Sequence, residues 1–119
     1  MPHPVVHFEI VGSDAERLRR FYSELFTWEI KTAPETGDYG LVDRAVTGTI
    51  GGGIGASDDP QARGAVFYVA VDDPQAYLDR VEKLGGKTVV PVTEMPNIVT
   101  FAQFIDPQGN RIGLVKSTP

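Results

Sequence analysis

The chain has 119 residues, of which 41% are hydrophobic and 23% are charged, so its length and composition are those of one ordinary globular domain. It contains no cysteine, which excludes a disulfide framework, a thiolate metal site and a cysteine nucleophile, and which fits a reducing compartment such as the cytoplasm. A net charge of −5 argues against nucleic-acid binding, no apolar stretch is long enough to span a membrane, and the first ten residues do not predict a signal peptide.

The first predicted element is a strand over residues 5–11, which is rich in apolar and β-branched residues. Strand alternation places Phe8 and Ile10 on one face, and His7 and Glu9 on the other. A carboxylate two residues away can orient or charge an imidazole, so His7 and Glu9 are candidate ligand-contacting or catalytic residues. The alternative interpretation is a polar histidine satisfied by a neighbour or by water.

A helix is predicted directly after this strand. Ser13 and Glu16 have the spacing of a capping box at its start. The apolar residues that follow recur at intervals of three and four, as in one buried helical stripe. They are Leu18, Phe21, Tyr22, Leu25 and Phe26. Further strands are expected at residues 27–32, 39–46 and 47–54, with a loop around residues 34–38.

The pattern restarts after a polar connector at residues 57–63. A strand is predicted over 65–71. Asp73 is then a plausible N-cap with Pro74 at the first helical position, and Gly85 and its neighbour stop the helix.

The last part of the chain predicts a strand, a loop and a hairpin. The strands are expected at residues 87–90, 98–105 and 111–116, with the loop over 91–97. The turn sequence DPQGN at residues 106–110 closes the hairpin. A five-residue turn pairs Ile105 with Arg111 and places Gln103 opposite Gly113. Gly113 is unusual because a glycine inside a strand has no side chain to pack.

Both halves of the chain therefore show the order β-α-β-β-β. A shift of 60 residues places VGSDAERLRRF over VDDPQAYLDRV and matches Leu18 with Leu78. This regularity indicates an internal repeat. The predicted fold class is α+β, with two βαβββ modules at about residues 4–56 and 64–116.

Four stretches give the chain a resemblance to a known family. They are FYSELFTWEI, VAVDD, KLGGK and FIDPQGNRIGLVK, and the last contains the most specific motif. Together they resemble the glyoxalase / bleomycin-resistance / extradiol-dioxygenase superfamily, also called vicinal oxygen chelate proteins. The resemblance implies two modules whose strands form a curved mixed β-sheet around a cavity. It also implies a homodimer.

The resemblance further implies where a metal would be bound in metal-dependent members. Its ligand positions fall on His7, on a residue in the strand at 47–54, on Val66 and on Gly113. Only His7 carries a donor, and the strand at 47–54 contains no histidine, glutamate, aspartate or glutamine. A divalent metal needs about three protein ligands. We therefore expect no metal and no other cofactor, and we expect a ligand to fill the space at Gly113.

A set of residues on the expected cavity face combines aromatic walls with a few polar groups, as small-molecule pockets do. The candidate ligand-binding residues are His7, Glu9, Tyr68, Phe101, Gln103, Arg111 and Gly113. For Tyr68 and Phe101, the alternative is ordinary core packing. The glycine-rich run at residues 51–55 lacks the Lys-Ser/Thr of a phosphate-binding loop, which leaves a flexible loop or a strand approached closely by another backbone or a ligand.

The leading functional prediction is a metal-independent protein that binds an aromatic or amphipathic metabolite or antibiotic as its small-molecule partner. The first alternative is a metal-independent isomerase or lyase with His7 or Glu9 as acid/base. The second alternative is a metal-dependent glyoxalase or dioxygenase with unusual ligands.

Overall fold

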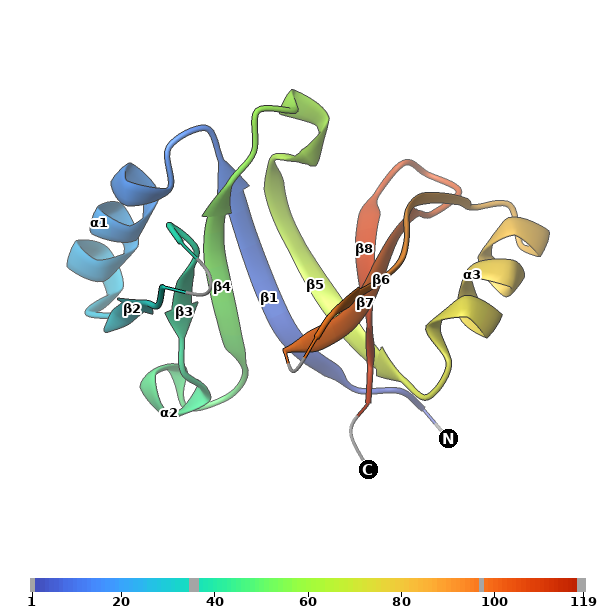
Figure 1. Ribbon diagram of the computed structural model, residues 1–119, viewed down its shortest axis with the longest axis horizontal. Helices are drawn as coiled ribbons and strands as arrows, with labels where there is room; N and C mark the ends of the chain where they lie inside the picture. Colours follow the sequence, from blue (N-terminus) through green and yellow to red (C-terminus); the bar gives the residue numbers. More distant parts are fainter. Residues whose placement is uncertain (1, 35–36, 97, 118–119) are drawn as a thin grey trace. The chain divides into compact units, whose positions relative to one another are not determined.

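The computed structural model describes residues 2–34, 37–96 and 98–117. It has two compact units (Figure 1). The N-terminal unit comprises residues 7–66. The C-terminal unit comprises the residues up to Val6 together with those from Phe67 onward.

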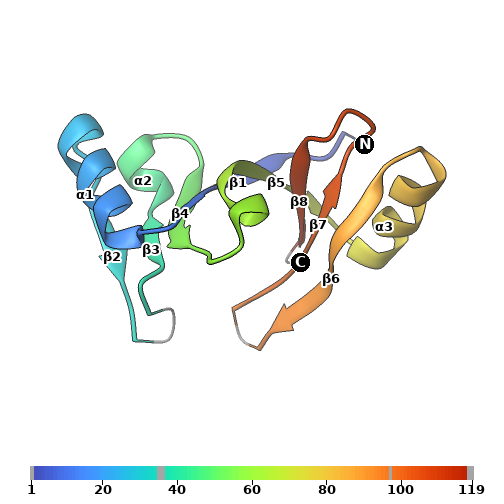
Figure 2. The same ribbon diagram turned by 90° about the horizontal axis from the view of Figure 1, so that it is seen from above.

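The N-terminal unit contains four strands in the order β2-β3-β4-β1, with β1 and β4 parallel and the other neighbours antiparallel. Figure 2 shows α1 beside the strands of this unit. A 3₁₀ turn, Pro60–Ala62, follows β4. The elements are β1 (Val5–Gly12), α1 (Ala15–Phe26), β2 (Ile30–Thr32), β3 (Gly40–Val42), α2 (Arg44–Thr47) and β4 (Gly51–Ala56).

The C-terminal unit repeats this plan with the strand order β5-β8-β7-β6, again with its first and last strands, β5 and β8, parallel. Its helix α3 lies beside these strands (Figure 2). The elements are β5 (Gly64–Val71), α3 (Pro74–Lys83), β6 (Lys87–Met95), β7 (Val99–Ile105) and β8 (Arg111–Lys116).

Each unit also has an equivalent backbone hydrogen bond of its own, just beyond its parallel strand pair. In the N-terminal unit the backbone N–H of Ser57 donates to the carbonyl of Gly12 at 2.9 Å. In the C-terminal unit the N–H of Ser117 donates to the carbonyl of Val71 at 2.8 Å. The internal repeat seen in the sequence is therefore also present in the hydrogen bonding of the structure.

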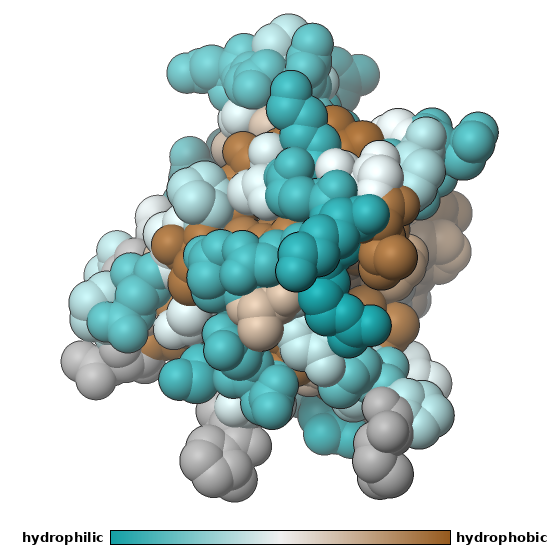
Figure 3. Space-filling model, turned by 90° about the vertical axis from the view of Figure 1, so that its right-hand side faces the viewer, coloured by the Kyte–Doolittle hydropathy of each residue, from teal (hydrophilic) through white to brown (hydrophobic). Residues whose placement is uncertain are grey.

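The helix α3 packs on one face of its sheet and forms the core of the C-terminal unit. The buried cluster consists of Val71, Leu78, Ala102 and Leu114. Val69, Tyr77, Val92 and Phe104 pack against it. Asp73 caps the helix by accepting from the N–H of Ala76, and Pro74 is its first residue, as predicted. On the side of the molecule seen in Figure 3, hydrophilic side chains cover most of the surface, with hydrophobic atoms between them.

The cap of α1 differs from the prediction. The N-cap is Asp14, not Ser13, and its side chain accepts from the N–H of Arg17 at 3.1 Å. Glu16 forms an exposed ion pair with Arg20 at 3.1 Å. Ser13 and Asp14 can both cap, and the carboxylate gains an additional favourable interaction with the helix dipole.

The apolar stripe of α1 is less buried than the sequence predicts. Phe21, Leu25 and Phe26 are 55%, 56% and 53% exposed. Leu18 and Tyr22 are half-buried. Tyr22 and Phe26 surround Trp28, and the ring of Phe8 from β1 joins them, with centroids 5.2–5.9 Å from that of Trp28.

The strand expected at residues 39–46 ends early. Only Gly40–Val42 pairs as a strand, and the short helix α2 follows because Asp43 accepts from the N–H of Ala45 at 2.8 Å. Gly48, at φ 83°, ends α2. A polar capping residue thus overrides the β-branched residues Val46 and Thr47, whose weak strand preference suggested a continued strand.

The loop expected at residues 91–97 is also wrong over most of its length, because β6 continues to Met95; residue 97 lies outside the described residues. The β6–β7 pair has two register shifts, at Thr88/Val90 and Val90/Thr93, and Pro91 falls within the second of them. A proline is tolerated at such irregularities and on edge strands because no ladder hydrogen bond needs its missing N–H. β6 stands last in the strand order.

The C-terminal hairpin has the predicted register. Ile105 pairs with Arg111, Gln103 with Gly113, and Phe101 with Val115. The turn is held by the Asp106 carboxylate. Its Oδ1 accepts from the backbone N–H groups of Asn110 and Gln108, each at 2.9 Å. The hydrogen bonds from the backbone and side chain of Asn110, followed by that from Gln108, lower the pKa of Asp106.

None of the helices described here has the length and apolar character that crossing a membrane would require.

Candidate functional site

A chain of polar side chains crosses the C-terminal unit on the sheet face opposite α3. Arg111 Nη1 donates to Gln103 Oε1 at 2.7 Å, and Gln103 Nε2 donates to the Tyr68 hydroxyl at 2.6 Å. Tyr68 and Gln103 are buried, at 6% and 8% exposed, and Arg111 is half-buried. The network therefore runs from the buried Tyr68 on β5 outward to the more accessible Arg111 at the start of β8.

Strand alternation explains why these three side chains meet. On β7, Ala102 belongs to the helix-side core, so Gln103 points to the opposite face. On β8, Leu114 belongs to that core, so Gly113 and Arg111 lie on the opposite face. The sequence-predicted residues Tyr68, Gln103, Arg111 and Gly113 are thus brought together in one unit.

The glycine in β8 makes room for an aromatic ring. Tyr68 and Gly113 are direct partners in the parallel β5–β8 pair. A Cβ at position 113 would overlap the Tyr68 ring, so only glycine lets the ring lie flat across the strand. The space at Gly113, expected to hold a ligand, is therefore filled by Tyr68. Direct contact of either residue with a ligand remains a prediction.

Phe101, also predicted to contact ligand, stands on the same face of β7 as Gln103 by alternation and is half-buried. It pairs across the sheet with Val115 and with Thr93. It therefore adds an aromatic side chain to the face that carries the Arg111–Gln103–Tyr68 network.

A second polar cluster lies in the N-terminal unit, around Tyr39 in the segment before β3. The Tyr39 hydroxyl donates to Glu9 Oε2 at 2.8 Å, and His7 Nε2 lies 3.5 Å from the same hydroxyl. His7 and Glu9 share one face of β1, as predicted, while Phe8 packs on Trp28 on the other face. The structure thus adds Tyr39 to the two residues found from the sequence.

The glycines of β4 hold Tyr39 in place. A Cβ at Gly53 would overlap the Tyr39 ring, and one at Gly55 would press on it, while one at Gly52 would overlap the ring of Phe8. The glycine-rich run is therefore a strand that aromatic rings approach closely. Alternate glycines on one strand face were the available sequence signal for such an approach, although they could not identify Tyr39.

The imidazole of His7 is held toward its neutral form. Burial lowers the pKa of His7 from its usual 6.5, and the negative charge of Glu9 opposes this by raising it. A neutral imidazole next to a carboxylate and a phenol can accept or relay a proton. The cluster thus has the groups that acid/base chemistry requires.

The residues present do not fit a metal site of the family type. Among the described residues, no three His, Cys, Asp or Glu side chains come together as a possible metal site. At the expected positions Val66 has no donor and Gly113 is covered by Tyr68. In the N-terminal unit Gly53 has the corresponding place: it pairs with Glu9 on the parallel strand and is covered by Tyr39.

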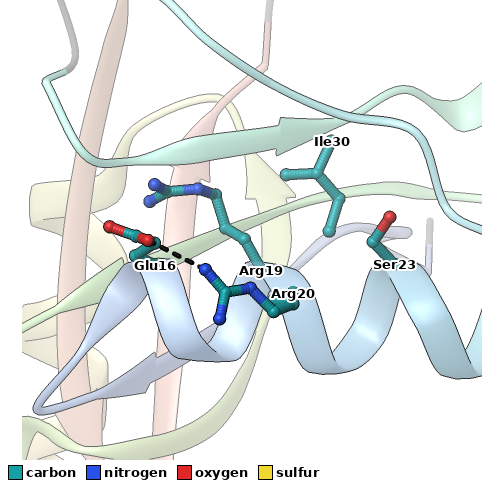
Figure 4. Close-up of a pocket in the computed structure, with 5 residues that line it drawn as sticks. All are labelled: Glu16, Arg19, Arg20, Ser23 and Ile30. Carbon is teal, nitrogen blue, oxygen red and sulfur yellow. Dashed lines mark hydrogen bonds and ion pairs between the residues drawn. The ribbon is translucent and has the colours of Figure 1, made fainter.

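A surface depression on the helix side of the N-terminal unit lies away from the His7 face of β1. Figure 4 shows the five residues that line it, which are Glu16, Arg19, Arg20, Ser23 and Ile30. Arg20 is paired with Glu16, and Arg19 donates to the Asp38 carbonyl. Its charged groups therefore already have partners within the unit.

The sequence matches a known superfamily and several of its proteins. The profile of the Glyoxalase/Bleomycin resistance protein/Dioxygenase superfamily matches residues 5–114. A glyoxylase-like domain-containing protein of Didymella fabae is 34% identical over 110 residues, covering 86% of this chain and 84% of that protein. A putative glyoxylase of Mycobacterium bovis is 29% identical over 114 residues, covering 89% of this chain but only 42% of the relative.

Solved structures show the same fold at low sequence identity. A superfamily member from Vibrio splendidus has a TM-score of 0.64 at 17% identity, covering 98% of this chain and 100% of that one. Methylmalonyl-CoA epimerase from Mycobacterium tuberculosis has a TM-score of 0.64 at 19% identity, covering 97% of this chain and 88% of that one.

Proposed function

The chain belongs to the glyoxalase/bleomycin resistance protein/dioxygenase superfamily, and on that premise we propose that it binds an aromatic or amphipathic small molecule without a metal. The observation that carries this proposal is the Arg111–Gln103–Tyr68 network. Buried polar side chains are costly unless they are fully bonded, so a small domain gains little stability from them. Small-molecule sites, in contrast, require a few fixed polar groups beside aromatic walls.

The test of binding uses ligand titrations followed by ¹⁵N–¹H NMR, with 2-naphthol and 2-naphthoate as aromatic probes. We expect saturable shifts that centre on the backbone amides of Tyr68, Gln103 and Gly113. The variant Gln103→Leu removes the centre of the network and is expected to weaken binding of the probes. If neither probe shows saturable binding, the proposal is contradicted.

Metal independence is tested separately. We expect purified protein to carry much less than one equivalent of zinc, nickel, iron or manganese, and a chelator to leave both the melting temperature and probe binding unchanged. About one metal per chain, lost together with binding on chelation, would instead favour the second alternative drawn from the sequence, a metal-dependent glyoxalase or dioxygenase with unusual ligands.

The second candidate is an enzyme of the same fold that uses acid/base chemistry. The observation that favours it is the His7–Tyr39–Glu9 cluster, in which a single hydroxyl bridges an imidazole and a carboxylate. Isomerases and lyases of this type need a positioned group that removes a proton next to a carbonyl and returns one. His7 or Glu9 would exchange the proton, and Tyr39 would position them.

Proton exchange provides the assay for this candidate. Methylmalonyl-CoA in D₂O is a suitable probe because it has an acidic proton next to a thioester and because methylmalonyl-CoA epimerases share the fold. We expect exchange that His7→Ala or Glu9→Gln abolishes and Tyr39→Phe slows. Binding of the aromatic probes with no exchange at all would favour the binding protein over the enzyme.

Oligomeric state and location complete the proposal. The exposed apolar side chains Phe21, Leu25 and Phe26 on α1 are compatible with the expected homodimer, which light scattering coupled to gel filtration measures. The expected cytoplasmic location rests on the absence of cysteine. Fractionation of cells that express the tagged protein tests it.

A further inference from the structure

Arg111 is a half-buried cation that no acidic side chain neutralises within residues 2–34, 37–96 and 98–117. Its guanidinium group instead donates a hydrogen bond to the neutral carbonyl oxygen of the Gln103 side chain. A guanidinium group has five N–H donors, and this bond uses one of them. A partly desolvated cation whose other donors have no acceptor in the protein is unfavourable unless an anion or water satisfies them.

The acid nearest to Arg111 in the sequence does not supply that anion. Asp106, five residues earlier, uses its carboxylate in the DPQGN turn, where it accepts from the N–H groups of Gln108 and Asn110 and from the Asn110 side chain. Arg20 of α1, in contrast, is neutralised by Glu16. Arg19 resembles Arg111 in donating to a neutral carbonyl, that of Asp38, but it stands on the helix side of the N-terminal unit. The positive charge at Arg111 is thus a local feature of a chain whose net charge is −5.

The network also fixes the direction of the guanidinium group. Because Gln103 Oε1 accepts from the cation, its Nε2 is the group that faces Tyr68, and this end of the network is buried. Gln103 therefore anchors the guanidinium from one side, and the arginine side chain loses less freedom when it binds a second group. A guanidinium group recognises a carboxylate best, through two parallel N–H···O bonds.

We propose that Arg111 binds a carboxylate on the small-molecule ligand, so that the C-terminal unit selects aromatic or alkyl carboxylic acids over their neutral analogues. Gln103 is the residue that positions Arg111. The half-buried Phe101 and the Tyr68 ring lie on the same face and suit the apolar part of such an acid. This inference rests on the proposed binding function and adds the class of ligand to it.

The experiment compares 2-naphthoate with 2-naphthamide, which has a similar shape but no charge. By isothermal titration calorimetry, the unmodified protein is expected to bind the acid about tenfold more tightly than the amide, as expected for a charge-assisted bidentate pair. Arg111→Gln should remove this preference while leaving amide binding in place. Arg111→Lys keeps the charge but loses the bidentate geometry, and it should retain only part of the preference.

The matched control is Arg17→Gln, which makes the same change in net charge at an exposed side chain of α1. It should leave the preference unchanged, and a loss there would mean that overall charge, not Arg111, selects the acid. Melting curves confirm that each variant is folded, and Arg111→Lys provides the comparison if Arg111→Gln unfolds.

The outcomes separate this inference from the function on which it rests. Equal binding of acid and amide, unchanged by either Arg111 substitution, would overturn the carboxylate inference and leave the binding function standing. Failure of both probes to bind would overturn the binding function, and the carboxylate inference with it.

Discussion

On the sheet face opposite the helix, the N-terminal unit places an imidazole and a carboxylate around Tyr39, whereas the C-terminal unit places an amide and a guanidinium around Tyr68. The first set contains groups that can accept or relay a proton, and the second set offers hydrogen-bond donors, an acceptor and a cation for binding. The repeated scaffold thus carries two different kinds of chemistry.

The feature that the units share is a glycine under a tyrosine. Gly53 pairs with Glu9 on the parallel strand, and Gly113 pairs with Tyr68. In the C-terminal unit the ring that covers Gly113 belongs to its strand partner, Tyr68. In the N-terminal unit the ring that covers Gly53 belongs to Tyr39, which lies in the segment before β3. A glycine on the last strand therefore admits a ring from either source, and the ring's hydroxyl organises the neighbouring polar residues.

The largest expected difference between the units concerns their helices. Leu78 of α3 is 2% exposed inside the buried cluster, whereas its repeat partner Leu18 of α1 is only half-buried. Leu78→Ala should lower the free energy of unfolding by about 2–5 kcal/mol. Leu18→Ala should cost clearly less. Urea unfolding of the two variants measures both values, and equal losses would contradict the difference in packing.

The second expected difference concerns the two glycines. Gly113→Leu must displace the buried Tyr68 ring and should cost about 1–3 kcal/mol, as overpacking does. Gly53→Leu should cost less, since Tyr39 is half-buried, lies outside the regular strands and can move more readily.

Tyr68→Ala provides the control for this second difference. In that background Gly113→Leu should lose most of its effect on urea unfolding, because the ring that it would displace is absent. If the cost of Gly113→Leu is the same with and without the ring, the side chain at position 113 clashes with something other than Tyr68.

Much of the fold can be predicted from the sequence because local patterns determine where its strands pair. The DPQGN turn has a fixed length, so it sets the β7–β8 register at Ile105 and Arg111 correctly. The sequence is less informative where two local signals compete. Asp43 can cap a helix within an apparent strand, and Pro91 can either end a strand or occupy an irregularity in β6.

The candidate site is predicted only in part, for a related reason. Strand alternation identifies His7 and Glu9, and hairpin register identifies Gln103 and Arg111. Tyr39 is missed because it precedes the short strand β3 and reaches Glu9 across 30 positions of the chain. Its place depends on a tertiary contact with β4, which no local pattern in the sequence encodes.

The helix caps should reveal a similarity between the units. Asp14 and Asp73 each accept a hydrogen bond from the third residue of their helix. Each substitution to alanine should therefore cost about 1 kcal/mol, as measured by urea unfolding. Ser13→Ala should have little effect, and a loss at Ser13 as large as that at Asp14 would restore the capping box predicted from the sequence.

The smallest expected effect is on the pH dependence of the N-terminal unit. Burial lowers the pKa of folded His7 below the unfolded value of about 6.5, with the charge of Glu9 opposing this shift. Below pH 6.5 the unfolded chain therefore binds more protons at this residue than the folded chain does. The stability contributed by neutral His7 is complete above that pH and is lost as the pH falls toward the folded pKa.

Glu9→Gln should lower the His7 pKa further, and His7→Gln should remove this part of the pH dependence. An NMR titration of the His7 ring protons measures the shift, with His7→Gln to assign them, and a pKa that rises in Glu9→Gln would show that Glu9 does not act on His7 through its charge.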